Sequence, residues 1–187
     1  QAIPDDFFQR AEALGLETAQ TLVFQSMIYG GDNNQLVSVK AVDTSYPLRG
    51  ELIVADQPFA DGYPTDSVPS PGDIWLDSRL FPALGVSLGE EVEVGLASLR
   101  IGGVLVAEPD RGGSMFDLGP RLLMNLQDVP ATQVVQPGSR LSYRMLLAGA
   151  DDELDALKQA LPLQPNYRWA SIRESNSSIG NALDRAE

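Results

Sequence analysis

Four aspartates within a short stretch are the first candidates for chemistry in this sequence. They are Asp61, Asp66, Asp73 and Asp77. Closely spaced carboxylates can bind Ca²⁺ or serve as a general acid and base. These four do not follow the D-x-[DN]-x-[DN]-G order of an EF-hand loop, and they stand among Pro and Gly residues. We therefore interpret them as solvated acids in turns.

Two other patterns bear on phosphate binding and nucleophilic catalysis. Gly102-Gly103 and Gly112-Gly113-Ser114 match neither G-x-G-x-x-G nor G-x-x-x-x-G-K-[ST], so turn or bulge glycines are the better interpretation. Ser38 and Lys40 lack the S-x-x-K spacing of a Ser/Lys dyad, and they lie in a predicted strand. Neither pattern indicates an active site.

The composition excludes several classes of function. The chain has no Cys and no His, so thiolate nucleophiles, Cys-ligated zinc and the usual general base of hydrolases are all missing. Lys and Arg number 13 against 26 Asp and Glu, and the net charge of -13 disfavours nucleic acid and anionic lipid surfaces as partners. We expect no enzyme activity, no cofactor and no metal site.

Hydrophobic side chains that follow no regular period gather in predicted loops. They are Phe59, Tyr63 and the adjacent Met115 and Phe116, which are flanked by glycines. Loops carry binding residues on rigid scaffolds, and exposed aromatic side chains commonly anchor interfaces. We predict that these four residues form a protein interface. The alternative is that they fold back into the core of their own part of the chain.

Helices and longer strands are predicted at both ends of the chain. Pro4 and Gly15 delimit a helix, and the hydrophobic patterns predict the following further elements: a hairpin of 20–29 and 35–42, a strand at 141–148, a helix at 151–161, a short strand at 167–170 and the start of a helix at 176–187. The last helix has no stop signal, and we expect the natural protein to continue beyond it.

The middle of the chain has a different texture. Pro and Gly recur every few residues from Pro47 to about Gly138, and they separate short apolar runs that predict strands at 52–55, 73–76, 91–95, 98–107 and 121–125, with a short helix at 78–84. The sequence thus predicts an α+β fold. Residues 1–47 and 138–187 form a mixed α/β subdomain, and residues 48–137 form a small β-rich subdomain inserted into it.

Seven stretches carry a resemblance to a known family. They are Val39-Lys40-Ala41-Val42-Asp43 followed by Tyr46-Pro47-Leu48-Arg49-Gly50, Gly72-Asp73-Ile74-Trp75-Leu76, Leu84-Gly85-Val86-Ser87-Leu88-Gly89-Glu90-Glu91-Val92-Glu93-Val94-Gly95, Glu108-Pro109-Asp110, Pro120-Arg121-Leu122-Leu123-Met124-Asn125, and Val135-Gln136-Pro137-Gly138-Ser139-Arg140. In order and spacing, they resemble the first periplasmic domain of YbbP-type ABC transporter permeases, within the FtsX-like, MacB and LolC group. The resemblance covers the whole chain.

The resemblance implies a location and an architecture. Such a domain lies in the periplasm between the first and second transmembrane helices of an inner-membrane permease of the type VII ABC class. It has a Porter subdomain, built from both chain ends, and an inserted β-rich Sabre subdomain. This organisation agrees with the division at residues 47–48 and 137–138 that the sequence texture predicts.

The resemblance also implies a function and partners. ATP hydrolysis belongs to a separate cytoplasmic ABC ATPase subunit, and it moves the helices and the periplasmic domains, so no catalytic residue carries over to this chain. The implied partners are the permease's own transmembrane helices, its second periplasmic domain and a periplasmic esterase of the thioesterase or lysophospholipase type. The implied role is the extraction of hydrophobic or lipid-like molecules from the inner membrane.

Two other functions stay open at this point. One is a free periplasmic binding or sensor module for a small hydrophobic ligand, and the other is an acid-catalysed hydrolase with two convergent carboxylates. A permease domain connects to adjacent membrane helices at both ends. We therefore expect Gln1 and Glu187 to lie close together.

Overall fold

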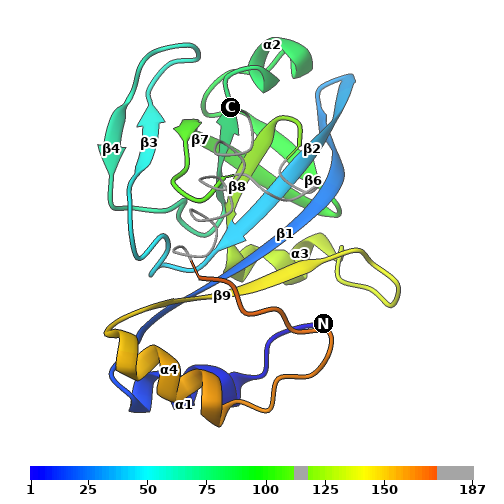
Figure 1. Cartoon of the computed structure of the whole chain (residues 1–187). Helices are drawn as coiled ribbons and strands as arrows, with labels where there is room; N and C mark the ends of the chain where they lie inside the picture. The colour runs from blue at the N-terminus through cyan, green and yellow to red at the C-terminus, as the bar shows by residue number, and fades with distance from the viewer. Residues whose placement is uncertain (112–117, 172–187) are drawn as a thin grey trace, which may run out of the picture.

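The computed structural model describes residues 1–111 and 118–171. The two longest helices, one from each end of the chain, lie together on one side of the structure, and a large sheet occupies the rest (Figure 1). The elements in chain order are α1 (Asp5–Ala13), β1 (Glu17–Gly30), β2 (Asn33–Val42), β3 (Leu52–Ala55), β4 (Tyr63–Thr65), β5 (Asp73–Asp77), α2 (Leu80–Leu84), β6 (Glu91–Val94), β7 (Ala97–Ala107), β8 (Arg121–Asn125), η2 (Leu126–Asp128), α3 (Val129–Thr132), β9 (Ser142–Ala148) and α4 (Asp151–Ala160).

Six strands close into a ring through their hydrogen-bonded pairs. The order around the ring is β1, β2, β8, β5, β7, β6 and back to β1. The β2–β8 and β5–β7 pairs are parallel, and the other pairs in the ring are antiparallel. Outside the ring, β3 pairs with β7, β4 pairs with β3, and β9 pairs with β1. Closure leaves fewer unpaired strand edges than an open sheet would have.

The interior of the ring is the main hydrophobic core. Alternate residues of β1 point inward, among them Phe24 and Ile28, and the strands across from them contribute Val39 and Val94 at the matching positions. All four side chains are buried because period-2 alternation places one face of each strand inside the ring. Helix α2 adds Leu80 and other apolar side chains to this core.

A second core lies between the two longer helices and β9. Phe7 and Ala11 of α1 pack with Leu157 of α4, on the helical spacing that places one apolar stripe toward the strands. Met145 and Leu147 of β9 line the same cluster. The chain ends thus form a small α/β layer of their own.

Strand β1 connects the helical layer with the ring. Its residues 17–23 pair with β9 on one edge, and its residues 21–30 pair with β2 on the other. In Figure 1, the blue ribbon of β1 runs without a break from beside α1 into the ring. The connection between the two layers is therefore continuous hydrogen-bonded sheet rather than a flexible linker.

The predicted elements are largely confirmed. The hairpin, the strands of the middle segment, the strand before α4 and α4 itself all form, and their ends differ from the predicted ones by a few residues. The short strand predicted at 167–170 is wrong, because no strand forms there. The ring of Tyr167 instead packs against that of Phe7 in a tilted arrangement, at a centroid distance of 5.6 Å, and Trp169 packs against the same cluster.

The prediction that residues 48–137 form a small β-rich subdomain, separate from the α/β subdomain into which it is inserted, needs a correction. Strand β8 pairs in parallel with β2, and β6 pairs with β1, so the middle segment supplies strands to the sheet that also holds β9. The physical reason is that the long hairpin exposes two edges, and the middle strands satisfy the backbone groups on both. The helices and β9 stand apart in the second core, but the outer part of the hairpin belongs to the ring.

Two predictions concern the ends of the chain. Asn166 Nδ2 donates a hydrogen bond of 3.3 Å to Gln1 Oε1, so the first residue lies beside the segment that follows α4. Glu187 and the helix predicted at 176–187 lie outside the described residues. In residues 1–111 and 118–171, no helix has the length and apolar character that a membrane crossing requires.

Candidate functional site

Five polar side chains meet on the outer face of the ring and form what we call the buried ionic network. Lys40 projects from β2 and Arg121 from the neighbouring strand β8. Glu108 and Asp110 follow the end of β7, and Tyr46 follows the end of β2. The network therefore joins two adjacent strands to the two chain segments that cross over them.

The distances within the network are those of direct ion pairs. Lys40 Nζ lies 2.7 Å from Asp110 Oδ1 and 3.4 Å from Glu108 Oε2. It also donates to the hydroxyl of Tyr46 at 3.0 Å, and that hydroxyl in turn donates to Asp110. Arg121 Nε lies 2.7 Å from Glu108 Oε1. Each cation thus faces a carboxylate, and the two pairs share Glu108.

The depth of this network is unusual for charged groups. The side chains of Arg121, Glu108 and Lys40 are 0%, 1% and 2% exposed, and that of Asp110 is 30% exposed. Charges buried this deeply are stable only when they are paired, because desolvation costs several kcal/mol for each ion. Arg121 also donates to Ser38 Oγ at 2.6 Å.

The network shifts the pKa values of two of its members. Burial raises the pKa of the Tyr46 hydroxyl, and the negative charge of Asp110 raises it further. For Asp110, burial acts to raise the pKa, but the charge and hydrogen bond of Lys40 and the hydrogen bond of Tyr46 outweigh it, and the pKa lies below its ordinary value. At neutral pH Tyr46 is a neutral phenol and Asp110 is ionised.

This arrangement fastens chain segments and does not favour catalysis. A catalytic tyrosine needs a lowered pKa to act as a base or nucleophile, and the pKa of Tyr46 moves the other way. Ser38 Oγ accepts a hydrogen bond from the guanidinium of Arg121. A hydrogen-bond donor cannot take up the hydroxyl proton of Ser38, so this contact does not activate Ser38 as a nucleophile. The network instead ties residues 108–110, at the exit from β7, to β2 and β8.

The sequence-predicted interface residues are placed in part. Phe59 lies in the connection between β3 and β4 and is 68% exposed, and Tyr63 opens β4 and is 48% exposed. The hydroxyl of Tyr63 donates to Asp56 Oδ1 at 2.9 Å. Met115 and Phe116 lie outside the described residues. Of the predicted set, two exposed aromatic side chains therefore lie on one hairpin.

The acidic and glycine candidates take structural positions. Asp73 and Asp77 form ion pairs with Arg100 and Arg79, and in the described part of the chain no three carboxylates gather into a group that could hold a metal ion. Gly102 and Gly103 lie in β7, where the register with β5 shifts by one residue. The interpretation of these two as bulge glycines is confirmed.

The sequence patterns alone do not identify the buried ionic network. A signal was present, since Lys40 interrupts an apolar strand and Arg121 opens another. The stretches that carry the family resemblance also contain all five network residues. The sequence does not show that Glu108 and Asp110 contact Lys40, which lies about 70 residues earlier in the chain, because that contact depends on the strand order.

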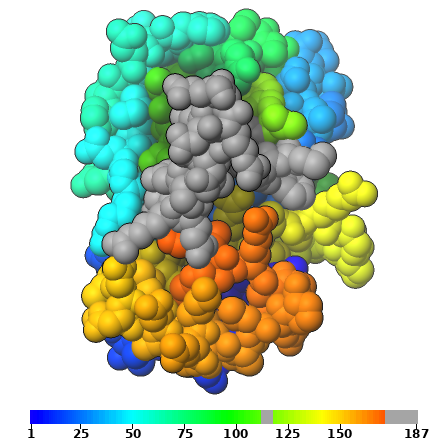
Figure 2. All heavy atoms as spheres, viewed as in Figure 1, coloured from blue at the N-terminus to red at the C-terminus, as the bar shows by residue number. Residues whose placement is uncertain are grey.

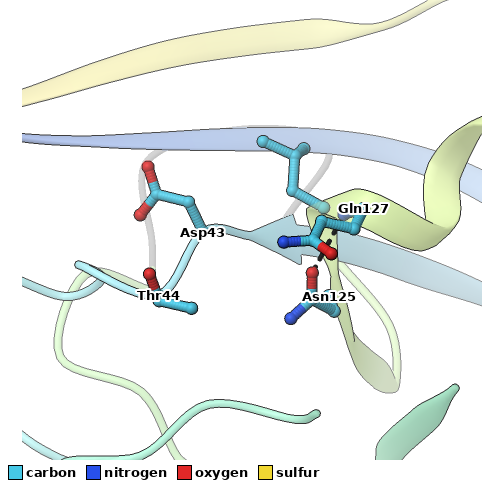
Figure 3. A pocket seen from close by; sticks show the side chains of 5 residues that line it. Asp43, Thr44, Asn125 and Gln127 are labelled. Atoms are coloured by element: carbon cyan, nitrogen blue, oxygen red, sulfur yellow. Dashed lines mark hydrogen bonds between the residues drawn. The ribbon is translucent and has the colours of Figure 1, made fainter. Parts of the chain in front are cut away.

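The surface of the described residues has two hollows beside the segment that follows β2. One, of about 290 Å³, is lined by Asp43, Thr44, Asn125, Leu126 and Gln127, and four of these side chains are polar (Figure 3). The other, of about 600 Å³, is lined by residues 44–48, 50–51 and 64–66. Apolar ligands favour enclosed sites lined by hydrophobic side chains. The lining surface of the larger hollow is mainly polar, whereas that of the smaller hollow is mainly apolar.

Comparison with known proteins decides the family. The family model described as MacB-like periplasmic core domain matches residues 1–162. The chain belongs to this family. The matched residues of this MacB-like domain include the helical layer, the ring and the buried ionic network, and the contacts of Asn166, Tyr167 and Trp169 lie just beyond them.

Individual relatives agree with the family. The domain is 36% identical over 187 residues to the ABC transporter permease YbbP of Escherichia coli strain K12, covering 99% of this chain and 22% of the relative. It therefore spans about a fifth of that permease. The extracellular domain of the ABC-type transporter YknZ from Gram-positive bacteria has the same fold, with a TM-score of 0.54, 13% identity and coverage of 80% of this chain and 76% of that one. The periplasmic region of MacB from Actinobacillus actinomycetemcomitans matches at a TM-score of 0.45, 15% identity, and 95% and 72% coverage.

Proposed function

We propose that this MacB-like periplasmic core domain transmits movement within an ABC transporter permease. A cytoplasmic ATPase subunit would move the membrane helices, the helical layer at the chain ends would receive that movement, and the ring would carry it to partners in the periplasm. Extraction of hydrophobic or lipid-like molecules, with a periplasmic esterase receiving them, is the form of this function that the YbbP-type resemblance favours.

The observation that carries the proposal is the continuity of β1. One strand of 14 residues pairs with β9 in the helical layer and with β2 and β6 in the ring. Hydrogen-bonded strands resist bending more than a single-chain linker does, because a hinge would break several ladder bonds at once. A displacement of α1 and α4 would therefore move the ring with them.

The buried ionic network supports the same function. It fastens the exit of β7 to β2 and β8 through four charged groups, so the outer segments of the ring stay attached when the ring moves. The mainly polar lining of the larger hollow argues against the other candidate, a free binding module for a small hydrophobic ligand. In this proposal the domain acts through contacts at its surface.

Spin labels can test this proposal directly. The chain has no Cys, so Asp32→Cys at the hairpin tip and Gln159→Cys on α4 place two labels, one in the ring and one in the helical layer. In the full-length permease with its ATPase, we expect the distance between these labels to be the same with and without ATP. The distance from position 32 to a label on the second periplasmic domain should change.

Two results would contradict the proposal. A nucleotide-dependent change in the distance between positions 32 and 159 would mean that the domain bends instead of transmitting movement. An unchanged distance to the second periplasmic domain would mean that ATP does not move this domain at all. Melting temperatures of the two cysteine variants serve as the folding control.

A further inference from the structure

The connection between β3 and β4 displays a large aromatic side chain to the solvent. Phe59 is 68% exposed, which is far above the core residues of the adjoining strands. Figure 2 shows the β3–β4 hairpin, in cyan, along an outer edge of the molecule, away from the helical layer. A side chain of this size normally gains free energy by leaving water, so its exposure requires a reason.

The backbone of Phe59 is held in a strained conformation. Its φ is +65°, in the left-handed region that bulky residues rarely adopt. Ser78 Oγ accepts a hydrogen bond of 2.9 Å from the Phe59 backbone N–H. At the other end of the loop, a Cβ on Gly62 would lie 2.6 Å from the Val54 carbonyl oxygen, so the loop presses closely on β3. Strain that the surroundings maintain is characteristic of functional positions.

The sequence on both sides of Phe59 is acidic. No Lys or Arg occurs between Arg49 and Arg79, a stretch that contains six acids. Asp73 and Asp77 have arginine partners in ion pairs, and Asp56 accepts a hydrogen bond from the hydroxyl of Tyr63. Asp61 and Asp66, on either side of Tyr63, are exposed, and no ion pair within the described residues neutralises them.

We propose that the β3–β4 connection is a docking element whose Phe59 enters an apolar pocket, edged by Lys or Arg, on a partner protein. Asp61 and Asp66 would face the basic edge of that pocket. The strained loop fixes the position of the Phe59 side chain before binding, which lowers the entropy cost of binding. A second copy of this chain is a poor partner because both copies carry a net charge of -13, and an anionic membrane is excluded on the same ground. This inference rests on the proposed function, in which the domain acts through protein contacts.

A photo-crosslinking amino acid at position 59 tests the docking element. Benzoylphenylalanine in place of Phe59, in the full-length permease within native membranes, keeps an aromatic ring at the loop. Leu96, which is 75% exposed in the β6–β7 turn, is the control position. We expect crosslinks from position 59 to a protein segment rich in Lys or Arg, and none to that segment from position 96.

Charge reversal supplies the second arm. Asp61→Lys with Asp66→Lys should lower the crosslink yield at position 59 at least about tenfold, because like charges at a contact cost more than the free energy of a tenfold change. Asp32→Lys with Glu93→Lys changes the net charge equally on exposed residues of the ring, and should leave the yield within about twofold. Reversal of the basic partner residues to Glu should restore the yield in the Asp61 and Asp66 double variant.

Several results would overturn the docking proposal. They are crosslinks to lipid, to an acidic segment or to a second copy, an absence of crosslinks at position 59, and equal losses in the two double variants. The failure is separable from that of the proposed function. If the spin-label distances respond to ATP as expected while position 59 gives no such crosslink, only the docking element is wrong.

Discussion

Replacement of Arg121 by Met gives the most direct test of the buried ionic network. Met is apolar and fills a similar length, so the substitution removes the charge and the hydrogen bonds with little change in volume. The Glu108 carboxylate then keeps Lys40 Nζ at 3.4 Å and Arg111 Nε at 3.9 Å, but it loses the contact with Arg121 Nε at 2.7 Å. Its carboxylate remains 1% exposed, so water cannot replace the lost partner without structural change.

The expected loss of stability is large. Removal of one partner from a buried ion pair costs about 3–5 kcal/mol. Here the Glu108 carboxylate loses its closest partner and keeps only the longer contacts with Lys40 and Arg111. A domain of this size unfolds with a free energy of about 5–15 kcal/mol, so the loss is a large fraction of the total. At about 2–4 °C for each kcal/mol, the melting temperature should fall by roughly 6–20 °C.

The matched control is an exposed ion pair of the same type. Arg49 and Glu17 are 2.8 Å apart, but their side chains are 62% and 63% exposed. Arg49→Met should cost less than about 1 kcal/mol, since solvent screens exposed pairs. The two variants remove the same residue type, so the difference between them isolates the effect of burial.

Urea denaturation followed by far-ultraviolet circular dichroism measures both variants. A double-mutant cycle of Arg121→Met and Glu108→Met should give a coupling energy of about 1–3 kcal/mol, with the double variant more stable than the sum of the single losses predicts. Equal losses for Arg121→Met and Arg49→Met, or a coupling energy near zero, would refute the reasoning that these charges form a buried, mutually dependent pair.

Three further predictions concern pH and backbone conformation. Burial raises the pKa of the Tyr46 hydroxyl above its value in the unfolded chain, which is about 10. The stability that this hydroxyl contributes is therefore complete below pH ~10, and it falls by about 1.4 kcal/mol for each pH unit above that. Denaturation between pH 9 and 11 should show this slope in the wild type but not in Tyr46→Phe. Gly95→Ala should destabilise the domain by at least about 2 kcal/mol more than Gly31→Ala. Both glycines have a φ of +56°, but only at Gly95 would the new Cβ lie 2.2 Å from the Thr132 carbonyl oxygen. Similar melting temperatures for the two variants would contradict this prediction. Phe59→Gly should be more stable to urea than Phe59→Ala by about 0.5–1 kcal/mol, because only glycine relieves the left-handed strain, and the opposite order would show that the loop is unstrained in solution.

Local structure could be predicted well from this sequence. The hairpin of β1 and β2 follows from two β-rich runs around Gly31, and α4 follows from an apolar stripe after a run of acids. These elements depend on contacts within a few residues, which a sequence pattern encodes directly. The strand predicted at 167–170 does not form, because its aromatic residues pack against the helices and not against a sheet.

The candidate site was predictable only in part. Phe59 and Tyr63 are exposed, as an interface requires. Their exposure follows from their place among Pro, Gly and Asp, Phe59 in the β3–β4 loop and Tyr63 at the start of β4. The strain at Phe59 was not predictable, because a positive φ at a residue other than glycine arises from the surroundings that hold it. The interface itself stays a prediction until a partner is found.

By itself, the sequence determined which chemistries this protein lacks and which short elements it forms. Without His or Cys no thiolate or imidazole catalysis is available, and the excess of acids sets the net negative charge. Only the tertiary structure decided that the middle strands close a ring with β1 and β2, and that Lys40, Glu108 and Arg121 pair away from water. The physical reason is that strand order and charge pairing depend on contacts between residues far apart in the chain, and the free energy of those contacts appears only when the whole sheet is formed.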